Sequence, residues 1–453
     1  MNILGIDIGT TTVTALVLDT ENKAVAKSCT LKNDSFIEGK PFERLQDPEK
    51  IIKIVKEAVA SVTENVTPDA VGVTGQMHGI LYLDEDFSPC SPLMIWQDER
   101  GNEAYNEKES YAEFLTRKTG IKAASGFGLT THFYNVCNNL VPENAVMLST
   151  IHDYLVGVLT KKKPLTHSSD GASLGFFDIE SLCFDEDALF LAGINPDFLP
   201  EVLNNTEKAG ATNCDFLPDG IPVSVAIGDN QASFLGSVAD SECSVLVNVG
   251  TGSQVSFATE STTLSSAGEI RPLTDDKYLY VGSSLCGGRA YAILKNFFSL
   301  CADMLGGSKD NLYEKMDALS EGVFNIEDAL AVNCEFCGTR DDPSKRGFIE
   351  NIGTENLTPQ HLICGVLKGV SKELFDMYNG ARNLQKTEPQ YLVCSGNGLR
   401  KSEVWRAIFN RDFSLPTHLP LYSEEAAIGA CVFASVASGI FPDIATAQNN
   451  LLR

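Results

Sequence analysis

The chain has 453 residues, 43% of them hydrophobic, and its 35 basic and 60 acidic side chains give a formal net charge of −25. A surface of this sign repels nucleic-acid phosphates, so the composition argues against a nucleic-acid-binding protein, and an anionic ligand needs local backbone N–H groups, a helix N-terminus or a divalent cation. The length predicts two or three domains, each large enough to bury a core.

The first predicted element is a β-hairpin over residues 3–19, ILGIDIGTTTVTALVLD, with a Gly-Thr-Thr turn. Because the chain enters this strand directly, without a signal-peptide pattern, we expect a cytoplasmic protein. Gly9 allows a ligand to approach the backbone closely, and the N–H groups of the turn can converge on an anion. The hydroxyl groups at the same edge are those of Thr10, Thr11 and Thr12. Asp7, at the strand end, can hold Mg²⁺ beside a phosphate. A simple tight turn is the alternative interpretation.

Strands and helices alternate after this hairpin, which predicts an α/β fold. Apolar residues at helical spacing predict a helix over 48–63, and strands are predicted over 70–74 and 80–83. Polar residues at the ends of apolar strands form a candidate sugar site, in which an aromatic ring covers one face of the sugar. The candidates are Gln76, Met77 and His78 in GQMHG, Trp96 and Asp98 in WQDER, and His152, Asp153 and Tyr154. Each of them alone is also explained by a structural role.

An apolar strand over 221–227 runs into Gly228 and Asp229 and then into a helix of small residues. Asp229 therefore lies at or near a helix N-terminus, where aspartate is a favoured N-cap. The functional interpretation is a general base that accepts the proton of an attacking hydroxyl during phosphoryl transfer. A helix N-terminus would keep this carboxylate ionised.

Residues 246–257, LVNVGTGSQVSF, repeat the pattern of the opening hairpin about half a chain length later. A single recurrence at this distance predicts two domains of similar topology, 1–240 and 241–453, that face each other across a ligand-binding cleft. The second turn contains Gly250, Thr251 and Gly252. Two such turns can hold one polyphosphate, and an acid for the metal is present only in the first, which suits a single MgATP.

Three features of the second half complete the pattern. Residues 391–398, YLVCSGNG, predict a buried strand and a glycine-rich turn that a planar nucleotide base can approach. The close pair Cys334 and Cys337 lacks a second CxxC and a nearby histidine, so we expect structural thiols, with zinc or redox use as the alternative. Residues 426–441 are uncharged but too weakly apolar for a membrane span and predict a packed core helix. P-loop, GxGxxG and HExxH motifs are missing.

These segments together resemble the FGGY carbohydrate kinases, a family in the actin/hexokinase group of ATPase folds. The matching segments, in the order of the family, are GIDIGTTTV, GQMHG, WQDER, HDYL, IGDNQAS, NVGTGS, CGTRDDP, SGNGLRKSEVW and EEAAIGA. The resemblance extends from end to end of the chain. It implies an α/β fold with two ribonuclease-H-like domains that close on ATP and a sugar.

The resemblance also implies a role for each candidate residue. Asp229 corresponds to the catalytic base of the family, and Asp7 to the acid beside the metal. Its phosphate loops match residues 9–12 and 250–252, its adenosine motif matches Gly396, Asn397 and Gly398, and its sugar side matches Gln76, Met77, His78, Trp96 and Asp98. The chain departs from the family at Thr12 and Thr14, where many members have Ser and Lys, and at Asn397, where a third glycine is usual.

Within the family, the segments SGFG at 125–128, TIHDY at 150–154 and SSLCGGRAYA at 283–292 resemble sedoheptulokinases more than xylulokinases. We therefore expect ATP-dependent phosphorylation of a terminal hydroxyl of sedoheptulose, with ATP and Mg²⁺ as cofactors and Asp229 as general base. The alternatives are xylulose, another pentulose or a polyol as substrate. A non-catalytic nucleotide-dependent switch is the alternative from a different class. We expect no membrane partner, and both a monomer and a homodimer stay open.

Overall fold

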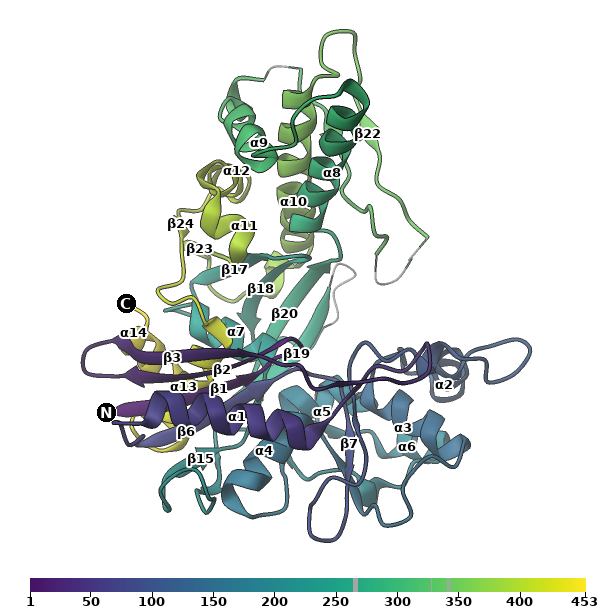
Figure 1. The fold of residues 1–453 in the computed structure, drawn as a ribbon, viewed down its shortest axis with the longest axis vertical. Helices are drawn as coiled ribbons and strands as arrows, with labels where there is room; N and C mark the ends of the chain where they lie inside the picture. Colours follow the sequence, from purple (N-terminus) through teal and green to yellow (C-terminus); the bar gives the residue numbers. More distant parts are fainter. Residues whose placement is uncertain (264–267, 327, 340–341, 343) are drawn as a thin grey trace. The chain divides into compact units, whose positions relative to one another are not determined.

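The computed structural model describes residues 1–263, 268–326, 328–339, 342 and 344–453. The chain forms two compact units (Figure 1). Unit 1 comprises Met1–Ala239, Arg271–Lys277 and Leu421–Arg453, and unit 2 comprises Asp240–Ile270 and Tyr278–Pro420. In the CGTRDDP segment, Arg340, Asp341 and Pro343 lie outside the described residues.

The large sheet of unit 1 has the strand order β14-β15-β6-β1-β2-β3, and β16 also pairs with β6. Its strands are β1 (Asn2–Ile8), β2 (Thr12–Asp19), β3 (Ala24–Lys32), β6 (Ala70–Gly75), β14 (Lys208–Ala211), β15 (Pro222–Ser224) and β16 (Ile227–Gly228). The antiparallel pairing of β1 with β2 confirms the first predicted hairpin. Strands β1, β15 and β16 all run parallel to β6, so their carboxyl ends lie at one edge of the sheet.

Helices cover both faces of this sheet. Successive residues of a strand point to opposite faces, and in β1 Leu4, Ile6 and Ile8 join the core formed with α1 (Pro48–Thr63) and α4 (Ile151–Thr160). On the other face, Ile3 packs with α13 (Glu425–Ala437) and α14 (Ile444–Leu451). Helix α1 has the predicted bounds because Asp47 accepts hydrogen bonds from the first free N–H groups and proline occupies the first helical position.

Helix α13 lies so close to the sheet and to α7 (Asp229–Ser237) that glycine is required at the contacts. A Cβ atom at Gly72 of β6 would collide with the carbonyl oxygen of Ala430, and one at Gly429 with that of Ala232. The structure therefore places the C-terminal helices in unit 1, which differs from the predicted division into 1–240 and 241–453. The prediction of a packed core helix is confirmed. No helix in the described part of the chain is long and apolar enough to cross a bilayer.

A second core of unit 1 supports the loops that follow β6. Its helices are α2 (Tyr111–Thr119), α3 (Gly128–Cys137), α5 (Ser168–Leu174) and α6 (Glu186–Ala192). Short strands pair around them: β4 (Phe36–Ile37), β5 (Leu45–Gln46), β7 (Leu81–Leu83), β8 (Leu93–Met94), β9 (Met147–Ser149), β10 (Thr166–His167), β11 (Phe177–Asp178), β12 (Cys183–Phe184) and β13 (Val202–Leu203). This framework fixes the chain on either side of GQMHG and WQDER.

Unit 2 repeats the central topology of unit 1. Its sheet has the order β19-β20-β18-β17-β23-β24, in which residues 271–274 of the edge strand β19 are counted with unit 1. The antiparallel hairpin of β17 and β18 has β23 parallel to its first strand. The strands are β17 (Ser244–Val249), β18 (Ser253–Thr259), β19 (Glu269–Thr274), β20 (Lys277–Ser284), β23 (Tyr391–Ser395) and β24 (Thr417–His418), with β21 (Ala331–Val332) and β22 (Ile349–Glu350) apart from this sheet. The helices are α8 (Gly288–Leu305), α9 (Leu312–Ser320), α10 (Pro359–Ala381), α11 (Gly396–Lys401) and α12 (Glu403–Phe413). The series β23-β17-β18-β20 thus matches β6-β1-β2-β3, which confirms the predicted repeat.

The thirteen cysteines are free thiols. Cys334 is buried and its thiol faces the carbonyl oxygen of Val366 at 3.6 Å. Cys337 is partly buried, 3.9 Å from the sulfur of Cys286. The described cluster of potential metal ligands lies elsewhere, so the structural interpretation of these thiols is retained.

Candidate active site

The two candidate acids, Asp7 and Asp229, lie at the carboxyl edge of the sheet in unit 1. Ile8 of β1 and Gly228 of β16 both pair with Gly75 of β6, in parallel register. Asp7 directly precedes Ile8, and Asp229 directly follows Gly228. Since neighbouring strands are about 4.8 Å apart, the backbones that carry the two acids are separated by roughly 10 Å. Both residues are only partly buried, so a ligand can reach them.

Asp229 is the first residue of α7, and Gly228, not Asp229, occupies the N-cap position. The N-cap interpretation of Asp229 is therefore wrong. Burial raises the pKa of Asp229 to about 6, with His152 and Arg271 opposing and Asp170 adding to the rise. Burial also raises the pKa of Asp7, to about 7, and the negative charges of Asp229 and Glu424 add to the effect. Negative charge is thus concentrated at this edge.

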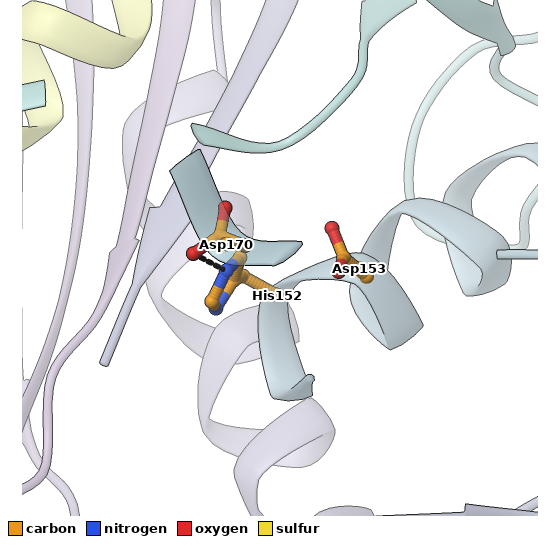
Figure 2. A group of neighbouring side chains, drawn as sticks. All are labelled: His152, Asp153 and Asp170. Carbon is orange, nitrogen blue, oxygen red and sulfur yellow. Dashed lines mark ion pairs between the residues drawn. The ribbon is translucent and has the colours of Figure 1, made fainter. Parts of the chain in front are cut away.

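A buried ion pair lies in the same region. Nε2 of His152, in α4, is 3.0 Å from Oδ1 of Asp170, in α5, and neither side chain is exposed (Figure 2). Burial alone would lower the pKa of His152, but attraction to Asp170, Asp153 and Asp229 raises it to about 9. This attraction favours the imidazolium form of His152, and its positive charge favours the ionised forms of Asp7 and Asp229.

Asp153 is the third member of this cluster. Its carboxylate, with the donor atoms of His152 and Asp170, forms a set of potential metal ligands that lie within 4.8 Å of one another. In Figure 2 the ion pair joins only His152 and Asp170. Burial raises the pKa of Asp153 to about 7.

The ion pair is connected to the ends of the strands that carry the two candidate acids. A Cβ atom at Gly75 would lie 3.2 Å from Nδ1 of His152 and 3.0 Å from the carbonyl oxygen of Ile8, so the imidazole packs closely against the end of β6. The hydroxyl of Ser169 accepts a hydrogen bond from the N–H of Gly228 at 3.1 Å and donates to Asp170 at 3.3 Å. Because His152 and Asp153 are completely buried, they cannot contact a sugar, contrary to the expectation from the sequence.

The first Gly-Thr turn presents its N–H groups on one side. The carbonyl oxygens of Gly9 and Thr10 accept hydrogen bonds from the side chains of Asn33 and Gln46, both at 2.9 Å, and the N–H of Asn33 donates to Thr11 at 2.8 Å. In a trans peptide the C=O and the N–H point in opposite directions. The N–H groups of residues 10–12 therefore point away from these partners, as an anion site requires.

The sugar-side residues of GQMHG differ in what they can offer. Gln76 is 3% exposed and bonds to Thr10 and Gln46. Met77 is buried, and its terminal methyl lies 2.6 Å from the position of a Cβ at Gly228. Nδ1 of His78 lies 2.6 Å from the carbonyl oxygen of Ser173, which can only accept, so Nδ1 carries a proton.

Two further contacts fix the rings of this region. The ring of His78 stacks on Phe127 at 5.1 Å between ring centres. The indole of Trp96 is 47% exposed, and its Nε1 donates to the hydroxyl of Thr10 at 3.0 Å. Gln46 bonds to Gln76, and Ser173 bonds to His78. The sequence did not predict either partner, because neither lies in a recognisable motif.

Asp98 does not have the place predicted for it. Its carboxylate accepts from Nε of Arg100 at 2.7 Å, from the terminal guanidinium nitrogen at 3.0 Å and from the backbone N–H of Arg44 at 3.0 Å. The side chain is fully buried. Its oxygens are therefore used to hold the WQDER segment together, and Asp98 has a structural role instead of the expected sugar contact.

In unit 2, the second turn and the glycine-rich turn line one pocket with a volume of about 610 Å³. Gly250 and Thr251 lie on its wall with Asn397 and Gly398, and aromatic side chains complete it: Tyr291, Tyr313 and Trp405. This volume is in the usual range for a small-molecule or cofactor site.

Hydrogen bonds and glycines shape this pocket. The N–H of Gly288 donates to Gly250 at 2.8 Å, which fixes the turn against the start of α8. Gly396 has a φ of 82°, a left-handed conformation that favours glycine. A Cβ at Gly398 would lie 3.0 Å from both Trp405 and Val249, so the turn packs closely against these residues. Gly252 follows Thr251 in the same turn, where a Cβ would approach the carbonyl oxygen of Ser284 at 2.8 Å.

Comparisons with known proteins agree with this geometry. Residues 2–236 match the FGGY family of carbohydrate kinases, N-terminal domain. Sedoheptulokinase of Homo sapiens is 27% identical over 95% of this chain and 96% of that protein. Gluconokinase of Bacillus subtilis (strain 168) is 24% identical over 96% of this chain and 87% of that protein.

A solved structure gives the same result for the fold. The crystal structure of xylulose kinase from Rhodospirillum rubrum superposes with a TM-score of 0.85 at 20% identity, over 100% of this chain and 93% of that chain. This similarity confirms the predicted fold class, an α/β protein with two ribonuclease-H-like parts of the actin/hexokinase ATPase type.

Proposed function

This chain belongs to the FGGY family of carbohydrate kinases, and we propose that it transfers the γ-phosphate of MgATP to a terminal hydroxyl of a ketose, with sedoheptulose as the first candidate. The relative named sedoheptulokinase covers nearly the whole chain, which supports this choice of sugar. The segments at 125–128, 150–154 and 283–292 support it independently. Kinases of this family use ATP.

The observation that carries the proposal is the shared register of three parallel strands at Gly75. It brings the Gly-Thr turn after β1, the GQMHG segment after β6 and Asp229 after β16 to the same edge of the sheet. Phosphoryl transfer requires these parts together: a base near the acceptor hydroxyl, donors around the phosphates and a pocket for the acceptor. If residues 9–12 formed only a tight turn, nothing would require an acid and a polar segment beside it.

Asp229 is the proposed general base. A carboxylate with a pKa of about 6 is mostly ionised at neutral pH, yet more basic than an ordinary aspartate, which suits acceptance of a proton from the sugar hydroxyl. The first turn follows β1 and α7 follows β16, and both strands pair with β6, so the base and the turn share a rigid frame. Gln76, Met77, His78 and Trp96 are the proposed sugar-side residues.

Asp7 is the proposed residue for Mg²⁺. Burial, and then the like charges of Asp229 and Glu424, raise its pKa, and a divalent cation bound there would offset both effects, so the site fits such an ion. When bound, Mg²⁺ supplies positive charge that neutralises phosphate oxygens. Asp7 holds the cation, while the N–H groups of residues 10–12 orient the phosphates.

The pocket of unit 2 is the proposed adenosine site. Gly250, Thr251 and Gly252 contribute phosphate contacts, and Gly396, Asn397 and Gly398 allow close approach of the base. Asn397 stands where a third glycine is usual in the family, and it lines the pocket.

A coupled ADP-release assay tests the proposal, with MgATP and matched concentrations of sedoheptulose, D-xylulose, D-ribulose, L-ribulose, glycerol and gluconate, and with the product identified by mass. A clear preference for sedoheptulose is the expected result. Preference for xylulose would keep the mechanism and replace the sugar, as the structural likeness to a xylulose kinase allows. Nucleotide binding without phosphorylation of any acceptor would favour a nucleotide-dependent switch instead.

A further inference from the structure

A closed circuit of hydrogen bonds lies between the first Gly-Thr turn and the sugar-side residues of unit 1. The hydroxyl of Thr10 donates to Oε1 of Gln76 at 3.0 Å, and Nε2 of Gln76 donates to Oε1 of Gln46 at 2.8 Å. Nε2 of Gln46 then donates to the carbonyl oxygen of Thr10 at 2.9 Å. The circuit therefore begins and ends on Thr10.

The circuit has a fixed direction. The carbonyl oxygen of Thr10 can only accept, so Gln46 directs its nitrogen to Thr10 and its oxygen to Gln76. Gln76 must then donate to Gln46 through its nitrogen, which leaves its oxygen to accept from the Thr10 hydroxyl. Gln46 and Gln76 are 0% and 3% exposed, so water cannot replace the lost partners. The hydroxyl hydrogen of Thr10 is thus directed to Gln76 and is not available to a phosphate, unlike the exposed hydroxyls of Thr11 and Thr12.

Trp96 is attached to this circuit from outside. Its indole N–H can only donate, and it donates to the remaining lone pairs of the Thr10 hydroxyl at 3.0 Å. Trp96 is 47% exposed, whereas the other tryptophan of the chain, Trp405, is 3% exposed. The hydrogen bond therefore ties the polar edge of a half-exposed ring to the turn.

The peptide between Thr10 and Thr11 faces the circuit with its carbonyl group and the anion side of the turn with its N–H group. The carbonyl oxygen of Thr10 closes the circuit through Gln46, while the N–H of that peptide, on Thr11, points to the opposite side, where the turn can meet an anion. A bound phosphate therefore acts on the peptide that sets the circuit. Ordering this peptide first makes the ordering of the attached ring less costly for a second ligand.

We propose that Gln46 and the Thr10 hydroxyl are positioning residues that couple the phosphate turn to the ring of Trp96, so that a nucleoside triphosphate at the turn raises the affinity for the ketose. The inference rests on the proposed function for the identity of the two ligands. Because coupling between two binding sites is reciprocal, the ketose also raises the affinity for the nucleotide.

The chain has only two tryptophans, so labelling with 5-fluorotryptophan gives two ¹⁹F NMR resonances, and Trp96→Phe assigns them. The probe is Mg²⁺ with a nonhydrolysable ATP analogue, added to the full chain without sugar. We expect both resonances to shift: that of Trp405 because it lines the pocket of unit 2, and that of Trp96 through the circuit. In Thr10→Val, the Trp405 resonance should still shift while that of Trp96 no longer follows it.

Thr14→Val is the matched control. Thr14 is 3% exposed and its hydroxyl pairs with that of Thr30 at 2.9 Å, so this variant also loses a buried hydroxyl but leaves Trp96 untouched. The Trp96 response should survive in Thr14→Val and in Thr10→Ser, which keeps the hydroxyl. Gln46→Met, which lacks the donor and the acceptor of the side-chain amide, should behave like Thr10→Val.

Calorimetry gives the second measurement, the dissociation constant of sedoheptulose with and without the saturating analogue. We expect the analogue to tighten sugar binding about 5-fold, the effect of one neutral hydrogen bond, and we expect this factor to fall to about 1 in Thr10→Val. Parent protein in which Trp405 responds and Trp96 does not, or Thr10→Val with the parental response, would overturn the coupling. If the protein phosphorylates another sugar but the Trp96 response still depends on the circuit, the proposed substrate is wrong and the coupling is retained.

Discussion

Nε2 of His152 lies 3.0 Å from Oδ1 of Asp170, and both side chains are completely buried under the strand ends that carry Asp7 and Asp229. The imidazolium of His152 favours the ionised form of Asp229, and Asp170 opposes it. Arg271 adds a second positive charge near the base. Burial is the largest cause of the raised pKa of Asp229, and the two members of the ion pair act on this pKa with opposite signs.

We predict that His152→Gln shifts the acid limb of the pH profile of kcat/KM to higher pH by about one unit. The substitution removes the nearby cation, so the pKa of Asp229 rises and the base is protonated over a wider range. The double variant His152→Gln/Asp170→Asn removes one charge of each sign and should return the limb toward its original position. A lower activity with an unmoved limb in the single variant would show that His152 only supports the fold.

Asp229→Asn should reduce kcat by at least about 100-fold, the lower end of the contribution of a general base, while both ligands still bind. The amide has nearly the same shape but cannot accept the proton of the sugar hydroxyl. Calorimetry with sedoheptulose and with the nonhydrolysable analogue separates binding from turnover. Near-normal turnover would remove Asp229 from the mechanism.

Asp7→Asn should raise the melting temperature at pH 8, measured with a chelator present. The pKa of Asp7 is raised in the folded state to about 7, so its contribution to stability is fully present below about pH 4 and is lost as the pH rises through 7. The difference between variant and parent should therefore shrink toward pH 5. Activity should fall, because the proposed metal ligand is lost.

Asp215→Asn provides the control of opposite sign. Asp215 is exposed and its pKa is lowered by the ion pair with Lys56 at 2.8 Å, so its ionised form is favoured in the folded protein. Its replacement should give no increase in melting temperature at pH 8. An equal increase in both variants would mean that the general acidity of the chain, and not the cluster at Asp7, Asp229 and Glu424, causes the effect.

The sequence predicted the parts of this protein that repeat a local pattern. The hairpins at β1 and β17, helix α1 and the GQMHG turn follow from residue spacing and turn chemistry, and they lie where they were predicted. The sequence could not show that Asp98 is used by Arg100, or that His152 is buried, because these outcomes depend on which segments meet in space. The role of Gln46 was even harder to predict from the sequence, since its partners lie 30 and 36 residues away and no motif surrounds it.

The placement of the C-terminal helix in unit 1 also depends on distant contacts, and it can be tested at Gly72. A methyl group there would meet the carbonyl group of Ala430 and lie 3.0 Å from the Cβ of Ala434, so α13 must move away from β6. We expect Gly72→Ala to lower the free energy of unfolding by about 2 kcal/mol, as overpacking does in other cores. Gly307→Ala is the control, since its new methyl would lie 3.7 Å or more from its neighbours. The free energy of unfolding is measured with urea. An equal decrease in the two variants would mean that close packing of α13 does not limit the size of residue 72.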